Sequence, residues 1–349
     1  MARPADDGFF MPAEWAPHSR CWMEWPCRAE TWGDHIDAAR EAYAEVARTI
    51  ARFEPVTMIV KPKNVAEVSI LVGAGTGISM FSLPHDDSWM RDNGPTFVVD
   101  GRGQVAGVDW RWNAWGNKYP DHDRDGAVAE AVLMHLEMRR YEAPIVNEGG
   151  AIHTDGEGTL LTTESVLLNP NRNPGISRAE MEEVLAAYLG IRKVIWLGEG
   201  LEGDRDADKG TDGHIDNLAC FARPGVVLAL TTSDTADPNY EILQDNLARL
   251  RAATDAQDRA LEIIEIEQPK RQVTAEGERL ALSYINFYIA NGGIVMPAFE
   301  DPQDARALQT LTKVFSDREV VQVPATDIVY GGGGIHCITQ QQPAGTSAM

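Results

Sequence analysis

The segment with the strongest chemical signal is a glycine-rich loop that ends in a cysteine, Gly331-Gly-Gly-Gly-Ile-His-Cys337. Consecutive glycines cost backbone entropy and are tolerated mainly where a chain turns tightly or approaches a ligand closely. A thiol directly after such a loop is expected to face a cleft, where it can act as a nucleophile. Cys21 and Cys220 instead lie among apolar residues and are predicted to be core thiols. We therefore predict that Cys337 is the reactive cysteine.

A histidine and an aspartate stand two residues apart in the segment Gly213-His-Ile-Asp-Asn217. In an extended segment this spacing places His214 and Asp216 on one face and Ile215 on the other. A proton carrier and a fixed negative charge would then share a site. The alternative is a histidine that only orients a surface turn.

Two further carboxylates stand beside turn residues. Asp92 lies in the acidic stretch Asp86-Asp-Ser-Trp-Met-Arg-Asp-Asn-Gly-Pro95, which also contains Trp89. Glu148 follows the apolar pair Ile145-Val146 and precedes two glycines. The alternatives are a plain turn residue for Asp92 and a solvated strand end for Glu148. Together with the cysteine and the histidine, these acids would surround a nucleophile with negative charge.

The net charge narrows the class of partner. The chain has 349 residues, and 31 Lys and Arg against 53 Asp and Glu give a formal net charge of −22 at pH 7. Such a charge repels phosphate backbones and anionic membrane surfaces and favours encounters with small cations. We therefore expect neither a nucleic acid nor a membrane partner. The sequence contains no apolar run of signal-peptide or membrane-span length, so the expected location is cytoplasmic.

This set of residues suits covalent attack on the carbon of a small planar cation. A guanidinium group is planar, always charged and carries five N–H donors, so two carboxylates can each grip one edge through paired hydrogen bonds. That grip would hold the central carbon beside the sulfur.

Three alternatives stay open on these residues. A metal site could use His214, Asp216, Glu148 and Cys337, although H-x-x-x-H, H-E-x-x-H and paired-cysteine spacings are absent. A Cys-His-Asp protease would not need this many carboxylates to hold a neutral peptide carbonyl. A polyamine-binding protein without catalysis would explain the acids and leave the glycine-rich loop without a purpose.

Helical and strand patterns alternate along the chain, which predicts an α/β protein. An amphipathic helix is expected over 36–50 and a strand over 56–60. A capping box at Ser177 and Glu180 begins a helix that Gly190 ends. The other expected helices are 238–252 and 302–315, and the other expected strands are 193–197, 226–231, 261–266, 285–289 and 320–323.

Polar or glycine-rich segments separate these elements at five places. They are Arg91–Pro95, Asn147–Gly150, Asp212–Asn217, Asn291–Gly293 and Gly331–Cys337. Five such segments suit five repeated α/β units whose strand ends point toward one centre. Because no linker composition interrupts the chain, we predict a single domain over 1–349, with loosely held tails at about 1–8 and 344–349.

Eight motifs occur in order and cover nearly the whole chain. They are Met11–His18, Asp87–Thr96, Trp112–Gly116, Glu148–His153, Leu168–Pro174, Gly213–Asn217, Tyr284–Gly293 and Ile335–Pro343. This series resembles the agmatine deiminases (agmatine iminohydrolases), a family of the guanidine-group-modifying, or pentein, superfamily. The resemblance implies a five-bladed α/β propeller of pseudo-repeats around a central active site, no metal or organic cofactor, and a homo-oligomer.

The resemblance also implies a reaction, hydrolysis of agmatine to N-carbamoylputrescine and ammonia through a covalent thiouronium intermediate. The residues implied to act on this cationic guanidino substrate are the nucleophile Cys337, the general acid and base His214, the guanidinium-binding Asp92 and Asp216, the further pocket acid Glu148, and the enclosing Trp89 and Trp115.

Two departures from the family pattern concern the substrate. The family motif reads Gly-Gly-Asn-Ile-His-Cys before the nucleophile, whereas this chain has Gly334 at the asparagine position. The segment 267–280 is also shorter than the usual loop. We expect either change to reshape the end of the pocket that is distant from the guanidine carbon. The alternative to agmatine is therefore an arginine-like, shorter or longer guanidino compound.

Overall fold

The computed structural model describes residues 2–73, 75–205 and 209–345, and within them the strands form five separate sheets. The strands are β1 (Phe9–Phe10), β2 (His18–Glu24), β3 (Val56–Val60), β4 (Ile78–Ser82), β5 (Thr96–Asp100), β6 (Val105–Arg111), β7 (Arg139–Val146), β8 (His153–Thr154), β9 (Thr159–Thr163), β10 (Lys193–Leu197), β11 (Ala219–Arg223), β12 (Val226–Thr231), β13 (Glu262–Glu267), β14 (Tyr288–Ala290), β15 (Gly293–Ala298), β16 (Glu319–Pro324) and β17 (Thr339–Pro343). The sheet orders are β17-β2-β3-β4, β1-β5-β6-β7, β10-β9-β8, β11-β12-β13 and β14-β15-β16.

Helices alternate with these strands, so the fold is mixed α/β as predicted. The α-helices are α1 (Ala29–Trp32), α2 (Ile36–Ile50), α3 (Val65–Val72), α4 (Met90–Asn93), α5 (Ala114–Asn117), α6 (Val128–His135), α7 (Glu164–Leu167), α8 (Arg178–Leu189), α9 (Asn239–Ala252), α10 (Asp304–Val314) and α11 (Thr326–Val329).

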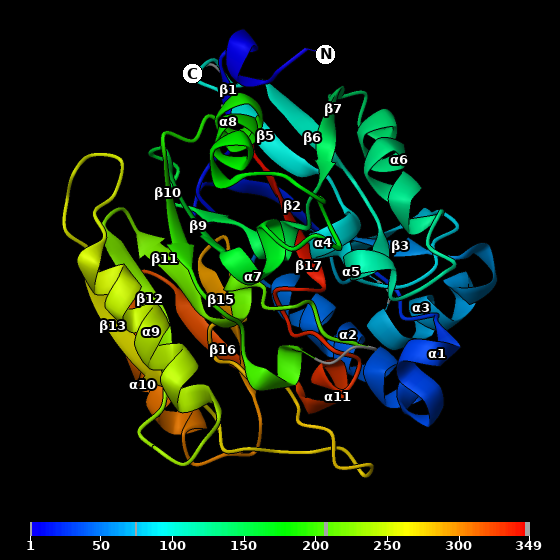
Figure 1. Cartoon of the computed structure of the whole chain (residues 1–349). Helices are drawn as coiled ribbons and strands as arrows, with labels where there is room; N and C mark the ends of the chain where they lie inside the picture. The colour runs from blue at the N-terminus through cyan, green and yellow to red at the C-terminus, as the bar shows by residue number, and fades with distance from the viewer. Residues whose placement is uncertain (1, 74, 206–208, 346–349) are drawn as a thin grey trace.

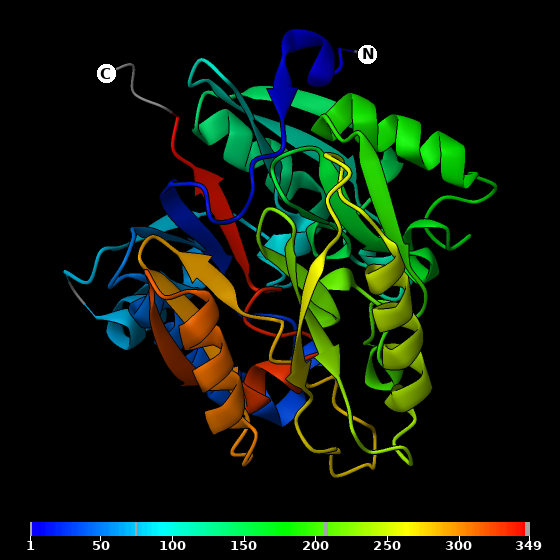
Figure 2. The ribbon, with the colours of Figure 1, turned by 90° about the vertical axis from the view of Figure 1, so that its left-hand side faces the viewer.

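Each sheet contains the same arrangement of three strands, an antiparallel pair followed by a strand parallel to its second member. The three-strand sets are β17-β2-β3, β5-β6-β7, β8-β9-β10, β11-β12-β13 and β14-β15-β16. Because parallel neighbours need a long crossover, a helix connects the last two strands of each set, namely α2, α6, α8, α9 and α10. The last four of these helices lie on the outside of the molecule (Figure 1). β17, near the C-terminus, lies beside β2, near the N-terminus (Figure 2).

Most elements predicted from local patterns are confirmed. α2 spans the predicted helix, and its apolar face buries Tyr43, Val46 and Ile50. The capping box before α8 forms with both hydrogen bonds, and Gly190 ends that helix at φ +70°. β3, β10 and β12 have the predicted bounds, and the remaining predicted helices and strands other than 285–289 agree within two residues.

The predicted strand at 285–289 is wrong in its first half. The chain turns tightly there, because the Ile285 N–H donates to Ser283 Oγ and the Phe287 N–H donates to the Ile285 carbonyl. β14 therefore begins only at Tyr288. The apolar residues favoured a β-strand, but the backbone of 283–287 forms a turn.

The prediction that the segment Asn291–Gly293 lies at the centre of the repeated units is also wrong. Ala290 pairs with Gly293 across the hairpin of β14 and β15, so Asn291 and Gly292 form a two-residue loop. Gly292 has φ +78°, a backbone conformation that glycine adopts without strain.

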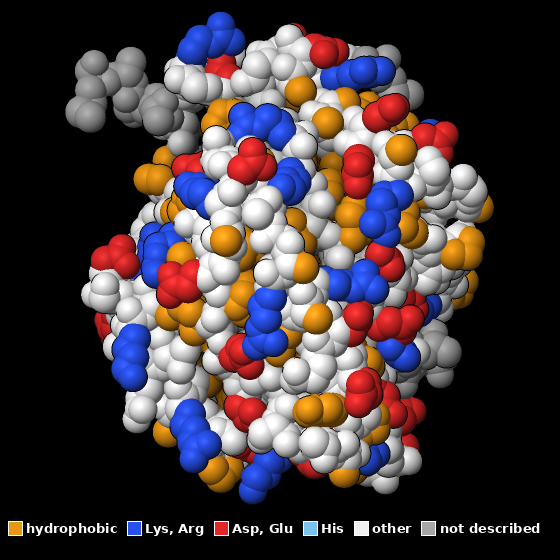
Figure 3. Space-filling view, turned by 60° about the vertical axis from the view of Figure 1, so that its left-hand side comes forward, with side chains coloured by type: hydrophobic (Ala, Val, Ile, Leu, Met, Phe, Trp, Pro, Cys, Tyr) orange, Lys and Arg blue, Asp and Glu red, His pale blue; other side chains and the backbone are white. Residues whose placement is uncertain are grey.

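No helix in the described part of the chain is both long and apolar enough to cross a membrane. The predicted tails lie partly outside the described residues, at 1 and 346–349, whereas Ala5–Asp7 forms a 3-10 helix and β1 pairs with β5. On the face shown in Figure 3, Lys and Arg are interspersed with Asp and Glu, so the excess negative charge does not form one patch there.

Candidate active site

Five predicted site residues meet at one buried point. The segments that lead into the first strands of four sets carry them, with Asp92 on α4 before β5, Glu148 before β8, His214 and Asp216 before β11, and Cys337 before β17. The two His214 ring nitrogens lie 3.7 Å from Asp92 Oδ1 and 3.6 Å from Glu148 Oε2. Cys337 Sγ lies 3.5 Å from Asp216 Oδ2. Each of these residues is at most 4% exposed. The alternatives of a surface turn for His214 and a solvated strand end for Glu148 are therefore wrong.

Gly150 allows three of these side chains to approach one another. A Cβ at this position would lie 2.5 Å from His214 Nδ1 and 2.9 Å from Asp92 Oδ1 and Asp216 Oδ2. Such distances are far shorter than van der Waals contact, so any larger residue would push the cluster apart. The Gly150 N–H also donates to Asp92 Oδ1 at 2.9 Å. The glycines after Glu148 are therefore part of the site.

The backbone that carries His214 and Asp216 is not extended as predicted. Ile215–Asn217 is a 3-10 helix, so the alternation of faces does not apply. The His214 N–H donates to Thr211 Oγ1 at 3.1 Å and to Asp204 Oδ2 at 3.2 Å, which fixes the start of this turn. Both side chains still reach the cluster because a tight turn holds them.

Four buried side-chain atoms of the cluster have no hydrogen-bond partner among the described residues. They are Glu148 Oε2, Asp216 Oδ1, His214 Nδ1 and His214 Nε2. Leaving buried polar groups unpaired is costly, so such groups commonly mark the place of a ligand. Carboxylate oxygens accept hydrogen bonds, so the ligand that fits them carries N–H donors.

His214 is surrounded by negative charge. Burial by itself would lower its pKa, but the carboxylates of Asp92, Glu148 and Asp216 raise the pKa to about 9. Burial and the neighbouring acids raise the pKa of Asp92 to about 6, against the opposing effect of His214. At neutral pH the site therefore combines a protonated imidazole with ionised carboxylates.

Arg172 supports Glu148 and was missed by the sequence analysis. Its Nε donates to Glu148 Oε1 at 2.8 Å, and its Nη2 donates to the Thr211 carbonyl at 2.8 Å. Burial would raise the pKa of Glu148, but Arg172 and His214 lower it to about 2. The available signal was the motif Leu168–Pro174, which marked the family without indicating a role for its arginine.

Glu14 and His336 support Asp216 in the same way, and they were also missed. His336 Nδ1 lies 2.9 Å from Asp216 Oδ2, and its Nε2 lies 2.9 Å from Glu14 Oε1. Arg91 Nη1 donates to the same Glu14 oxygen at 3.2 Å. Burial would raise the pKa of Asp216, but His336 and His214 lower it. Asp216 is thus held ionised and in one orientation.

The environment of Cys337, the predicted nucleophile, favours the neutral thiol over the thiolate. Burial, Asp216 and Asp92 together raise the pKa of Cys337 well above its usual value, although hydrogen bonds from the Gly334 backbone and from Asn286 oppose the increase. The negative field predicted from the sequence contributes, and burial contributes more. A cation bound between the thiol and the acids would favour the thiolate.

Both predicted tryptophans border the cluster. Trp115 Nε1 donates to Asp92 Oδ2 at 2.9 Å, and Trp115 has the rare backbone φ of +55°. Trp89 stacks on Trp32 with ring centroids 5.6 Å apart. A Cβ at Gly333 would lie 2.4 Å from the Trp89 ring and 3.0 Å from Cys337 Cβ, so this glycine lets the indole lie against the nucleophile loop.

The short segment 267–280 reaches the site indirectly. Arg279 Nη1 donates to Glu202 Oε2 at 3.0 Å, next to Asp204. Asp204 in turn accepts the His214 N–H, as described above. The segment therefore packs on the turn that supports the histidine.

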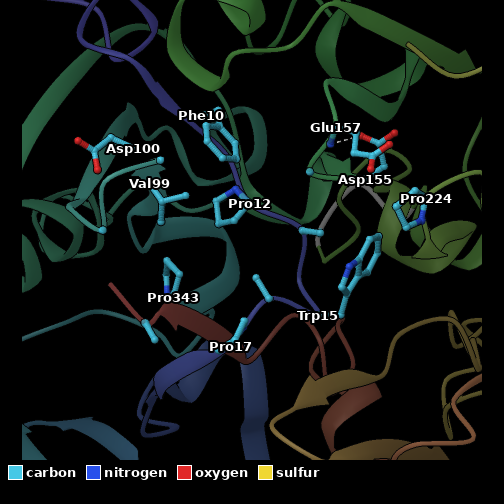
Figure 4. Close-up of a pocket in the computed structure, with 16 residues that line it drawn as sticks. Phe10, Pro12, Trp15, Pro17, Val99, Asp100, Asp155, Glu157, Pro224 and Pro343 are labelled. Atoms are coloured by element: carbon cyan, nitrogen blue, oxygen red, sulfur yellow. Dashed lines mark hydrogen bonds between the residues drawn. The ribbon is translucent and has the colours of Figure 1, made fainter. Parts of the chain in front are cut away.

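A separate apolar pocket contains none of these residues. Phe10, Pro12, Trp15, Pro224 and Pro343 line it between the N-terminal segment and the end of β17 (Figure 4). The predicted site residues lie instead in the cluster around Cys337. A buried thiol, an imidazole and three carboxylates around one point define a site for covalent attack on a planar cation. The described residues contain no group of three or more His, Cys, Asp and Glu arranged to hold a metal ion.

Comparison with known proteins agrees with this class of site. Residues 10–343 match the model of the Porphyromonas-type peptidyl-arginine deiminase family. An agmatine deiminase of Stutzerimonas stutzeri is 46% identical over 98% of this chain and 97% of its own, and one of Pseudomonas aeruginosa is 45% identical with the same coverage. The solved agmatine deiminase of Enterococcus faecalis superposes with a TM-score of 0.93 at 36% identity, covering 99% of this chain and 98% of that one. The chain belongs to this deiminase family, and its resemblance to agmatine deiminases is confirmed.

Proposed function

We propose that this chain hydrolyses agmatine to N-carbamoylputrescine and ammonia. The observation that carries the proposal is the buried cluster in which Cys337, His214 and three carboxylates surround one point. Full-length similarity to proteins named agmatine deiminases supports it. The chain is accordingly a hydrolase that acts on a C–N bond of a guanidino group.

Asp92 and Asp216 bind the guanidinium edges in this proposal. Both are buried carboxylates, and Asp216 Oδ1 is free to accept an N–H from substrate. Bidentate carboxylate–guanidinium pairs fix orientation as well as energy. These hydrogen bonds place the guanidinium carbon beside Cys337 Sγ, which lies 3.5 Å from Asp216 Oδ2.

The first half of the reaction forms the covalent intermediate. The bound cation favours the Cys337 thiolate, which adds to the guanidinium carbon and gives a tetrahedral adduct. His214 donates its proton to the departing nitrogen, ammonia leaves, and an S-alkylthiouronium on Cys337 remains. Glu148, next to His214 Nε2, stabilises the imidazolium that supplies this proton.

The second half uses the same groups in reverse. Neutral His214 takes a proton from water, and the resulting hydroxide adds to the thiouronium carbon. The C–S bond breaks as the added hydroxyl group loses its proton to solvent, where the released ammonia can take it up; the neutral ureido product leaves, and Cys337 is released as the thiolate. Trp89 and Trp115 enclose the alkyl chain of the substrate.

The wider architecture supports the same proposal. We propose a five-bladed α/β propeller of pseudo-repeats, with the active site at its centre and one domain over the whole chain, and the repeated three-strand sets support this proposal. A homo-oligomer and a cytoplasmic location stay predictions, which light scattering and cell fractionation would test.

A substrate panel tests the function directly. Purified protein is incubated with agmatine, arginine, and guanidino compounds of shorter and longer chain, with and without a chelator, and both ammonia and ureido product are measured. We expect agmatine to be the best substrate and the chelator to have no effect. Arginine as the best substrate would overturn the amine-terminated assignment. Binding of agmatine without turnover would favour the polyamine-binding alternative. Turnover that depends on a metal ion would favour the metal-site alternative.

The pH dependence follows from the protonation states. The reactive form holds a thiolate and protonated His214, one proton fewer than the resting neutral thiol with protonated His214. The resting site loses its first proton mainly from His214, whose pKa is about 9, and the reactive form is a minor arrangement of protons at that same level of protonation. We therefore expect kcat/KM to rise about tenfold per pH unit and to level off near pH 9. Below pH 6, protonation of Asp92 should steepen the fall. Initial rates across this range check the profile, and an acidic optimum would contradict it.

Alkylation measures the charge around the thiol. A cationic haloacetamidine resembles guanidinium, so it should inactivate the protein at least tenfold faster than neutral iodoacetamide at the same pH, because its charge favours the thiolate. Mass mapping should place the label on Cys337, and Asp216→Asn should reduce the preference. Equal rates, or labelling mainly at Cys21 or Cys220, would show that the acids do not surround the reactive sulfur.

A further inference from the structure

The side-chain amide of Asn286 lies against the sulfur of Cys337. Asn286 Nδ2 is 3.3 Å from Cys337 Sγ, within hydrogen-bond distance for sulfur, and Asn286 is only 2% exposed. Asn286 lies in the turn at 283–287 that replaces the first half of the predicted strand. Because the surrounding sequence is apolar, the sequence analysis did not predict that Asn286 lies at the site.

The orientation of this amide is fixed by its other hydrogen bonds. The His336 N–H, which can only donate, lies 2.9 Å from Asn286 Oδ1. The oxygen is thereby assigned, and the NH2 group must point the other way. There it faces Cys337 Sγ and Asn217 Oδ1, the latter at 3.2 Å. Of the two amide atoms, the donor Nδ2 is the nearer to the sulfur, at 3.3 Å, whereas Oδ1 lies 3.6 Å from Sγ and can accept a hydrogen bond only from the neutral thiol.

The place of Asn286 in the fold matches that of the other site residues. Asp92, Glu148, Asp216 and Cys337 each lie shortly before the first strand of a three-strand set. Asn286 lies two residues before β14, the first strand of the remaining set. All five sets therefore contribute a polar side chain to the same buried point.

Gly334 provides the space that Asn286 occupies. A Cβ at position 334 would lie 2.3 Å from Asn286 Oδ1 and 2.8 Å from its Cγ. Any side chain there would displace the amide. Position 334 is where this chain departs from the family motif, so the departure bears on the nucleophile.

We propose that Asn286 is a catalytic residue that donates a hydrogen bond from Nδ2 to the Cys337 thiolate, and that Gly334 is required for this contact. The proposal rests on the function proposed above. The donor stabilises the sulfur anion before it attacks and again when the C–S bond breaks. No proton is transferred, because a neutral amide keeps its N–H throughout. Burial and two acids oppose ionisation of this thiol, and the Asn286 amide acts with the Gly334 backbone against that effect.

Asn286→Asp and Asn286→Ala test the donor. The aspartate side chain still offers an oxygen that accepts the His336 N–H. The backbone carbonyl of residue 286 lies 3.3 Å from the same N–H and is present in both variants. Loss of a hydrogen bond to a charged group should lower kcat/KM by about tenfold to a hundredfold. The alkylation rate of Cys337 by iodoacetamide should fall, and its pH profile should move to higher pH. Asn64→Asp, on the Pro62–Asn64 turn, is the matched control and should leave both unchanged.

Gly334→Ala provides a second variant with Asn286 intact, and Gly101→Ala, which has open space around its Cβ position, is its control. Gly334→Ala should lower kcat/KM and shift the alkylation profile like the Asn286 variants. Lower turnover with an unchanged alkylation profile in folded variants would show a structural role and overturn the proposal. Wild-type turnover would also overturn it. Alkylation measures the reactivity of the Cys337 thiol and does not depend on turnover. If the deiminase assignment is wrong, the unaltered chain will show no turnover, and this result is distinct from the alkylation result.

Discussion

Replacing Cys337 with alanine should reduce turnover of agmatine by about 10⁴-fold or more, because nucleophile removal leaves only binding and electrostatic effects. In the proposed mechanism this sulfur forms the covalent intermediate, and no other thiol lies within the described cluster. Asp92, Asp216 and His214 stay in place in this variant, so agmatine should still bind. Single-turnover rates and equilibrium binding of agmatine measure the two effects separately.

Cys220→Ala is the matched control for this change. Cys220 is a core thiol on β11, so its removal should cost stability and leave kcat nearly unchanged. Mass spectrometry of the unaltered protein quenched during turnover should show agmatine-derived mass on Cys337 alone. Substantial activity in Cys337→Ala would rule out the covalent mechanism.

Replacing Asp92 or Asp216 with asparagine should lower kcat/KM by at least tenfold from the lost charged hydrogen bond. Misplacement of the guanidinium carbon should add up to about a hundredfold more. At Asp92 either orientation of the amide is poor, because both carboxylate oxygens accept N–H groups, from Gly150 and from Trp115. At Asp216 the change also removes the negative partner of His336.

Steady-state kinetics with agmatine measure these losses. Asp317→Asn, at an exposed position after α10, is the control and should have wild-type kinetics. Near-normal kcat/KM in both Asp92→Asn and Asp216→Asn would mean that other groups bind the guanidinium. A rise in KM alone would indicate that the acids contribute to binding and not to orientation of the reacting carbon.

The sequence by itself determined the local elements and the types of residue that do the chemistry. α2, α8 and β3 follow from side-chain periodicity and capping, which depend on residues within a few positions of one another. Cys337 and His214 stood out because their chemistry is rare and their neighbours are glycines and acids. The fold class also followed, because alternation of helix and strand patterns is itself a local property.

Only the tertiary structure decided how those residues are supported. Glu14 and His336 are 322 positions apart, yet their side chains are 2.9 Å apart, and no local pattern encodes such a pairing. Arg172 supports Glu148 from another loop in the same way.

The glycine-rich segments illustrate the same limit. Four of the five predicted segments lead into the site, but Asn291–Gly293 is a hairpin loop, and Asn286 takes the fifth place from within an apolar run. Hairpin loops and ligand-facing turns both favour glycine for its positive φ or close approach, so composition alone does not separate them. Which turn faces the nucleophile is fixed by the packing of five sheets around one point, and that depends on contacts between distant parts of the chain.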